Sequence, residues 1–235
     1  MSIKQTNFIE THPQKETSPQ FGTGGNDENY TPPWGVMPIL EYIPKGARVY
    51  CPFDLPCSQY VKLISKKHEV IFGHIATGQN FYEYMPPLNT WDVCITNPPF
   101  TNKAKIFERL LKTGKPFAIL MTFAWLRDVP PYNLFSKYNT VPQIMFLYDR
   151  LQFLISDDIN TMWLYQIFMS ICKGELGEKL NIRKRPKKLD KHGKLKDDRP
   201  SFASWYICHD FLPNGTAMTN VTELKKLYEG QGRLF

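Results

Sequence analysis

The 235-residue sequence lacks several features that would assign it to a familiar class of protein. Its five cysteines form no C-x-x-C pair, which argues against zinc, and their odd number favours reduced thiols in a cytosol. No Gly-rich, phosphate-cradling loop is present, which argues against the usual nucleotide-using α/β enzymes. The longest apolar run, Met162 to Cys172, is shorter than the about 20 residues that cross a bilayer, and the N-terminus has no signal pattern. We therefore expect a cytoplasmic protein with neither a metal nor a membrane partner.

Positive charge, by contrast, is concentrated in one segment. The net charge is +7, and the stretch from Lys173 to Arg199 holds 11 Lys and Arg against 5 Asp and Glu, leaving 18 and 17 elsewhere. A basic segment on a near-neutral body favours a polyanionic partner, nucleic acid first, although a solvated loop is the alternative. The candidate nucleic-acid-binding residues are Lys184, Arg185, Lys187 and Lys188.

Composition divides the chain into four parts within one domain. Residues 1–28 are polar, with few scattered apolar side chains, and are expected to be a disordered tail. Residues 29–154 form the expected core, and residues 155–199 form an insertion that carries the basic segment. Residues 200–235 are expected to supply a strand that returns to the core, followed by a tail.

Helical and strand patterns alternate along the core. The spacing of apolar residues predicts helices over 34–42, with Thr31 as N-cap, over 58–67, with Ser58 as N-cap, and over 103–112. Short apolar runs predict strands over 47–53, 69–75, 92–96, 116–123, 144–148 and 201–208. Apolar strands that alternate with helices predict an α/β fold with a doubly wound, mostly parallel sheet that is covered on both faces.

Two short stretches lie at the carboxyl ends of predicted strands. Phe53-Asp54 lies at the end of the strand over 47–53, and Asn97-Pro98-Pro99-Phe100 follows the strand over 92–96. Proline has no backbone N–H and disfavours helix, so the proline pair ends its strand and stiffens the chain that follows. Ligands of doubly wound sheets bind beyond the carboxyl ends of the strands, so both stretches are expected to share one crevice.

Asn97-Pro98-Pro99-Phe100 after a strand resembles the catalytic motif of amino-methyltransferases that use S-adenosylmethionine, in which Asn or Asp precedes two prolines and an aromatic residue. The resemblance covers about residues 29–153. The order of its motifs is similar to that of the small solitary adenine methyltransferases of phages and prophages. It implies a Rossmann-like class I methyltransferase fold and methyl transfer to the exocyclic amine of adenine in DNA.

The motif also suits this chemistry on physical grounds. The lone pair of an exocyclic amine is delocalised into the ring, so the nitrogen is a poor nucleophile. The Asn97 side-chain oxygen and a neighbouring backbone carbonyl can each accept one N–H, which draws the nitrogen toward tetrahedral geometry. Phe100 offers a face on which a base can stack, once the base has been flipped out of a duplex.

The same resemblance implies a set of cofactor-binding residues. Tyr30-Thr31-Pro32 is similar to an aromatic-Thr-Pro element that contacts the methionine end of the cofactor. Cys51-Pro52-Phe53-Asp54 is similar to an Asp-Pro-Phe element at the end of the first strand, with Cys51 in the place of the acid. Asn80-Phe81 resembles an Asp-Phe pair that packs on the cofactor adenine, although ordinary core packing explains Phe81 equally well. Glu69 and His74 are the residues available for the ribose hydroxyls.

Other readings stay open. An RNA base and the side-chain amide of protein glutamine present the same planar, conjugated NH₂ group as adenine in DNA, and the basic segment favours nucleic acid. A different class is a nucleic-acid-binding module that has this fold without catalysis. The loop from Leu55 to Ser58 favours this module, because it lacks the glycines that let the backbone approach a cofactor closely.

Overall fold

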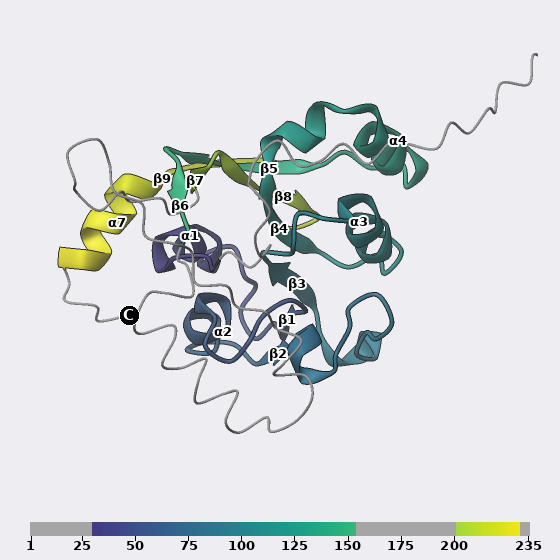
Figure 1. Ribbon diagram of the computed structural model, residues 1–235, viewed down its shortest axis with the longest axis horizontal. Coiled ribbons are helices and arrows are strands. Elements are labelled where there is room, and N and C mark those ends of the chain that lie inside the picture. Colours follow the sequence, from purple (N-terminus) through teal and green to yellow (C-terminus); the bar gives the residue numbers. More distant parts are fainter. Residues whose placement is uncertain (1–29, 154–200, 231–235) are drawn as a thin grey trace, which may run out of the picture.

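A computed structural model describes residues 30–153 and 201–230 (Figure 1). The strands are β1 (Val49–Cys51), β2 (Val70–Phe72), β3 (Val93–Thr96), β4 (Phe117–Thr122), β5 (Gln143–Tyr148), β6 (Leu151–Gln152), β7 (Ser201–Phe202), β8 (Ser204–His209) and β9 (Thr216–Asn220). The α-helices are α1 (Pro33–Leu40), α2 (Gln59–Ile64), α3 (Lys103–Leu111), α4 (Val129–Lys137) and α7 (Val221–Gly230). Short 3-10 turns are η1 (Ile75–Thr77), η2 (Leu88–Thr90) and η3 (Phe123–Arg127).

Seven strands form one sheet in the order β2-β1-β3-β4-β8-β5-β9. Neighbouring strands from β2 to β4 are parallel, β9 is parallel to β5, and β8 is antiparallel to both β4 and β5. Only β8 therefore runs against the other strands of this sheet. The predicted α/β fold with a mostly parallel sheet is confirmed.

Helices cover the sheet on both faces, with α1, α2 and α7 on one side and α3 and α4 on the other (Figure 1). The alternation of side chains along β4 shows the two cores. Phe117, Ile119 and Met121 pack toward α3 and α4, whereas Ala118 and Leu120 pack toward α1 and α2. Because strands buried on both faces need apolar residues at every position, this explains the unbroken apolar run in the sequence.

The predicted N-cap of the second helix is confirmed, and that of the first is wrong. Ser58 precedes α2, and its Oγ accepts a hydrogen bond of 3.1 Å from the backbone N–H of Tyr60. The N-cap of α1 is Pro32, and no side chain caps this helix. Thr31 instead turns its buried side chain inward, beside Tyr60.

The returning segment differs from the single strand predicted over 201–208. Exposed Ala203 separates β7, which pairs with β6 in a small second sheet, from β8. β8 enters the main sheet between β4 and β5, where Tyr206, Ile207 and Cys208 are fully buried. Three elements that the sequence patterns did not predict, α4, β9 and α7, complete this half of the fold.

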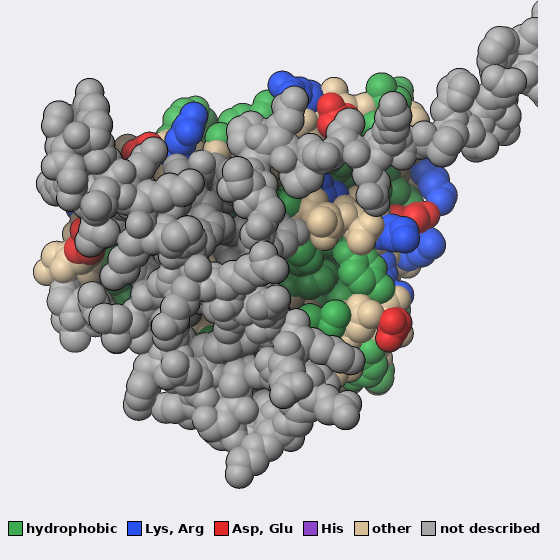
Figure 2. Space-filling view, in the orientation of Figure 1, with side chains coloured by type: hydrophobic (Ala, Val, Ile, Leu, Met, Phe, Trp, Pro, Cys, Tyr) green, Lys and Arg blue, Asp and Glu red, His purple; other side chains and the backbone are tan. Residues whose placement is uncertain are grey.

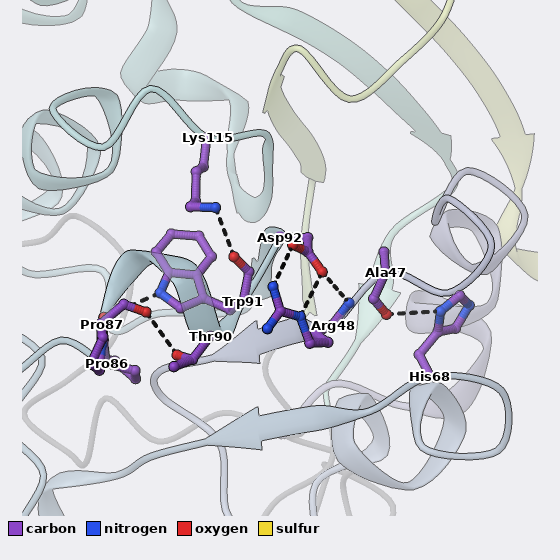
Figure 3. A network of polar contacts seen from close by, with 9 residues as sticks. All are labelled: Ala47, Arg48, His68, Pro86, Pro87, Thr90, Trp91, Asp92 and Lys115. Carbon is purple, nitrogen blue, oxygen red and sulfur yellow. Dashed lines mark hydrogen bonds and ion pairs between the residues drawn. The ribbon is translucent and has the colours of Figure 1, made fainter.

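Polar contacts fix the amino-terminal ends of β1 and β3, at the edge opposite their carboxyl ends (Figure 3). Arg48 binds Asp92 through Nε and Nη2 at 3.0 and 2.9 Å, and its backbone N–H donates to the same carboxylate at 2.8 Å. Beside them, the indole of the fully buried Trp91 donates to the carbonyl of Pro86, and Lys115 Nζ donates to the carbonyl of Trp91. These contacts hold the two strands in register.

Replacing Asp92 with Asn is expected to lower the melting temperature at pH 7 by a few degrees. The hydrogen bonds from Arg48 hold the pKa of Asp92 well below its usual range. Its contribution to stability is therefore present above the unfolded pKa of about 3.9 and is lost as the pH falls toward the folded value. Melting curves from pH 7 to pH 3 should show the deficit of the variant shrinking below about pH 4. Asp128→Asn, at an exposed aspartate, serves as the matched control, and a deficit that is constant with pH would contradict the role given to the ion pair.

The described surface carries charges of both signs. Figure 2 shows Lys and Arg side chains beside Asp and Glu along the margin that bears α3 and α4. There Glu108 on α3 pairs with Lys137 on α4 at 2.8 Å and with Lys112 at 3.7 Å. Among residues 30–153 and 201–230, no helix has the length and apolarity to cross a bilayer, and no group of three His, Cys, Asp or Glu side chains could hold a metal.

Candidate functional site

One cavity of about 330 Å³ opens beyond the carboxyl ends of β1, β2 and β3. It brings together most of the site residues that the sequence singled out. These are Tyr30, Thr31, Pro52, Phe53, Asp54, Asn80, Phe81, Asn97, Pro98, Pro99 and Phe100. Pro32 lies outside the lining, because it caps the start of α1.

Sequence reasoning missed several residues of the lining. They come from the loop before α2, from the first residue of α2, from η1 and from the turn that follows it, and they are Leu55, Cys57, Gln59, Ile75, Gln79 and Tyr82. Ser58 also lines the cavity, although the sequence identified it only as a helix cap. The signal that could have found this set is position, since each lies within three residues of a residue that the sequence had already singled out.

Asp54 is the organising residue of the site. Ser58 Oγ donates to one carboxylate oxygen of Asp54, and Thr96 Oγ1 donates to the other at 2.6 Å. The backbone N–H of Asp54 donates to the carbonyl of Gly73 at 2.9 Å. The side chain thereby ties together the loop after β1, the start of α2 and the end of β3.

Burial raises the pKa of Asp54 to about 6, and the hydrogen bonds from Ser58 and Thr96 oppose this rise. The group is therefore mostly ionised at pH 7 and gains a proton in mildly acidic solution. Because Thr96 immediately precedes Asn97, the contact with Asp54 also fixes the chain at the point where the proposed catalytic motif begins.

The motif itself occupies the connection between β3 and α3. Pro98 is buried, whereas Asn97, Pro99 and Phe100 are half-buried at the cavity. The ring of Phe100 lies 6.0 Å from the ammonium group of Lys103, at the start of α3. The two prolines fix the backbone φ angles of this connection, so the carbonyl of Pro98 is held in place relative to Asn97.

An aromatic wall closes another side of the cavity. The rings of Phe53 and Phe81 lie 4.8 Å apart, and Phe81 is only 3% exposed. Phe81 packs in the core, as the first of the two readings has it, and it also lines the cavity, so contact with a cofactor adenine stays a prediction. The amide of Asn80 holds its own turn, since Oδ1 accepts from the backbone N–H of Tyr82 at 3.1 Å and Nδ2 donates to Glu83 at 2.9 Å.

Of the two residues considered for ribose hydroxyls, only His74 lies at the cavity. Glu69 precedes β2 at the other end of the strand and is exposed. Burial lowers the pKa of His74 to about 4, so its imidazole is neutral at pH 7 and can both donate and accept a hydrogen bond.

The predicted nucleic-acid-binding residues, the N-terminal tail and the insertion over 155–199 lie outside the described residues. Comparison with known proteins found no family model that matches this chain and no curated protein that matches it. The geometry of the cavity and the chemistry of its lining are therefore the basis for the function.

Proposed function

We propose that this chain is an S-adenosylmethionine-dependent methyltransferase of the Rossmann-like class I type, and that it methylates the exocyclic amine of adenine in DNA. One observation carries the proposal. Asn97 to Phe100 and the segments that resemble cofactor-binding elements, around Thr31, Phe53 and Phe81, line the same cavity although they are far apart in the sequence.

The lining fits the chemistry of this cofactor. The volume of the cavity, about 330 Å³, lies within the range of about 300–1,000 Å³ that small-molecule sites occupy. Phe53 and Phe81 offer aromatic faces for the adenine ring, neutral His74 offers hydrogen bonds for hydroxyls, and Thr31 offers one for the amino-acid end. When bound, the cofactor supplies an electrophilic methyl group on a sulfonium.

The protein groups act on the target amine by positioning. The side-chain oxygen of Asn97 and the carbonyl of Pro98 each accept one N–H, which localises the nitrogen lone pair and directs it into the cavity. Neither acceptor titrates near pH 7, so the proton that the amine loses passes to water. Preorganised groups of this kind typically contribute about 10²–10³-fold each to a rate.

The choice of DNA rests on charge and on the flat target group. Phe100 at the cavity can stack on a flipped base, and the basic segment around Lys184 to Lys188 supplies charge for phosphates. RNA bases and protein glutamine are the alternative acceptors, and a non-catalytic module of the same fold is the alternative class.

The proposal is tested by supplying the purified protein with cofactor carrying a labelled methyl group, side by side with unmodified DNA, RNA and a cell protein extract. We expect label in DNA, on adenine N6. All three substrates present a planar NH₂ group, so all three are tested. Label in RNA or in protein, and none in DNA, would contradict the proposal that DNA is the substrate. Calorimetry that detects no cofactor binding up to millimolar concentration would favour the non-catalytic module.

A further inference from the structure

Five apolar side chains gather on one part of the main sheet, outside the cavity. They come from β5, β8, β9 and the residue after β4, and they are Phe123, Phe146, Tyr148, Trp205 and Met218. The ring centroids of Phe123 and Trp205 lie 4.1 Å apart, and those of Phe146 and Trp205 lie 4.5 Å apart. Met218 lies across from Phe146 and contacts the hydroxyl of Tyr148 through its sulfur. We call these five side chains the apolar face.

The apolar face lies on the side of the sheet that carries α3 and α4. Trp205 is the partner of Met121, which belongs to the core beneath those helices. Leu147 on β5 belongs to the opposite core. Because successive side chains of a strand point to opposite sides, its neighbours Phe146 and Tyr148 point to the α3 side.

Much of the apolar face is exposed. Phe123 is 40%, Tyr148 56% and Met218 70% exposed, whereas Phe146 and Trp205 are half-buried. Among the described residues, the core beneath α3 and α4 includes none of the five. Contiguous exposed apolar surface of this kind is typical of a place where another molecule binds.

The apolar face lies on the strands next to the proposed catalytic motif. Thr96, the last residue of β3, pairs with Ile119, so β4 continues through three more residues, Leu120, Met121 and Thr122. At about 3.3 Å per residue, β4 extends about 10 Å past the point where the motif begins. The motif then leads to α3, on the same side of the sheet. A polymer whose target group enters the cavity therefore has its neighbouring units beside this face.

Positive charge beside the apolar face favours a polyanion as that polymer. The chain over 154–200 leaves the fold after β6 and returns at β7, and these two strands pair with each other. The stretch from Lys173 to Arg199 holds 11 Lys and Arg against 5 Asp and Glu. Arg199 precedes Trp205 by six residues, which span at most about 22 Å. The basic segment is therefore joined to the fold next to the apolar face.

We propose that the apolar face stacks unpaired bases next to the target adenine, so that the protein binds single-stranded DNA in preference to the duplex of the same sequence. Aromatic rings combined with positive charge are the means by which proteins bind single strands. In a duplex, neighbouring bases cover the base faces, so only opened DNA presents them. The inference deepens the proposed function and rests on it, since that function places the target adenine in the cavity.

The test measures, by fluorescence anisotropy and without methyl donor, the binding of labelled, unmodified single-stranded DNA and of its duplex. Wild type should bind the single strand at least about tenfold more tightly, because each stacked base typically contributes about fivefold or more. Phe123→Leu keeps an apolar side chain but removes the ring, and it should weaken binding of the single strand about tenfold. Phe123→Tyr keeps the ring and should bind as wild type does.

The salt dependence of binding separates stacking from contact with phosphates. A ring neutralises no phosphate, so the slope of log affinity against log salt concentration should be the same in Phe123→Leu as in wild type. Tyr132→Leu is the matched control, because Tyr132 is an exposed aromatic residue on α4 outside the apolar face. This control should keep the full preference for the single strand.

Several outcomes would overturn the inference. They are wild type that binds both forms of DNA equally, and a folded Phe123→Leu that keeps the affinity of wild type. A variant that dissociates a dimer, with DNA binding unchanged, would show that the apolar face joins two copies of the chain. Wild type that prefers the single strand but transfers no methyl group to DNA would instead contradict the proposed function and leave the stacking surface in place.

A second measurement needs no variant. Single-stranded DNA that carries 5-iodouracil beside its one adenine is irradiated in complex with wild type, and the crosslinked peptides are identified by mass spectrometry. We expect crosslinks at Phe123, Phe146 or Trp205. Crosslinks that fall only outside the apolar face would overturn the inference.

Discussion

Replacing Asn97 with Ala is expected to reduce methyl transfer to DNA by about 10²–10³-fold or more, without loss of the fold. The substitution removes the side-chain oxygen that localises the amine lone pair, and it leaves the carbonyl of Pro98 as the single acceptor. Single-turnover transfer of labelled methyl measures the loss directly. Cofactor affinity, measured by calorimetry, should change little, because the amide acts on the target amine.

Two further variants sharpen this result. Asn97→Asp keeps an acceptor oxygen in the same place, and the motif in similar enzymes accepts either residue, so we expect it to retain part of the activity. Asn133→Ala, on the exposed surface of α4, should transfer methyl at the wild-type rate. Near-normal turnover by Asn97→Ala would show that the role given to this residue is wrong.

The sheet and the convergence of its strand ends follow from local patterns in the sequence. Short apolar runs, such as Phe117 to Thr122, indicate buried strands, and their alternation with helices indicates that the strands are parallel. Parallel strands place their carboxyl ends on one edge, so these patterns are sufficient to predict that Phe53-Asp54 and Asn97-Pro98 lie near each other.

Other elements depend on information that no local pattern carries. The direction of β8 is set by which strands accept it as a neighbour, and its alternating aromatic residues say nothing about that choice. The pair Pro130-Pro131 predicts the end of a helix or strand. Both prolines nevertheless fit in the first turn of α4, where a backbone N–H needs no partner within the helix. The strand β9 alternates between exposed and half-buried residues and has no buried one, so its sequence carries no hydrophobic pattern that distinguishes it from a loop.

The internal order of the site was hidden for a similar reason. Residues 60 and 206 are 146 positions apart, and Asp54 and Thr96 are 42 apart, so their contacts exist only after the sheet has formed. The sequence marks Ser58 as a helix cap but gives no sign that its hydroxyl also donates to Asp54. Motif comparison identifies residues that line the cavity and misses the contacts that hold them in place.

Asp54→Asn is expected to change how stability depends on pH. Asp54 has a pKa of about 6 in the folded protein and about 3.9 in the unfolded chain. The folded state therefore binds this proton more tightly, and the stability of wild type falls, through this group, as the pH rises from about 4 to 6. Asn carries no charge at any pH, so urea unfolding should show the variant gaining on wild type across that interval, by roughly 3 kcal/mol at most.

The comparison with wild type removes the other titrating groups. His74, whose pKa is lowered to about 4, destabilises the fold as the pH falls below its unfolded value near 6.5, but it does so equally in both proteins. Asp92→Asn provides the contrast, because the pKa of Asp92 is depressed and that variant loses most relative to wild type at neutral pH. The two substitutions are chemically identical, but the stability of the variant relative to wild type should rise with pH for Asp54→Asn, between about pH 4 and 6, and fall with pH for Asp92→Asn, below about pH 4. A relative stability of Asp54→Asn that does not rise between pH 4 and 6 would mean that burial does not raise the pKa of Asp54 in the folded protein.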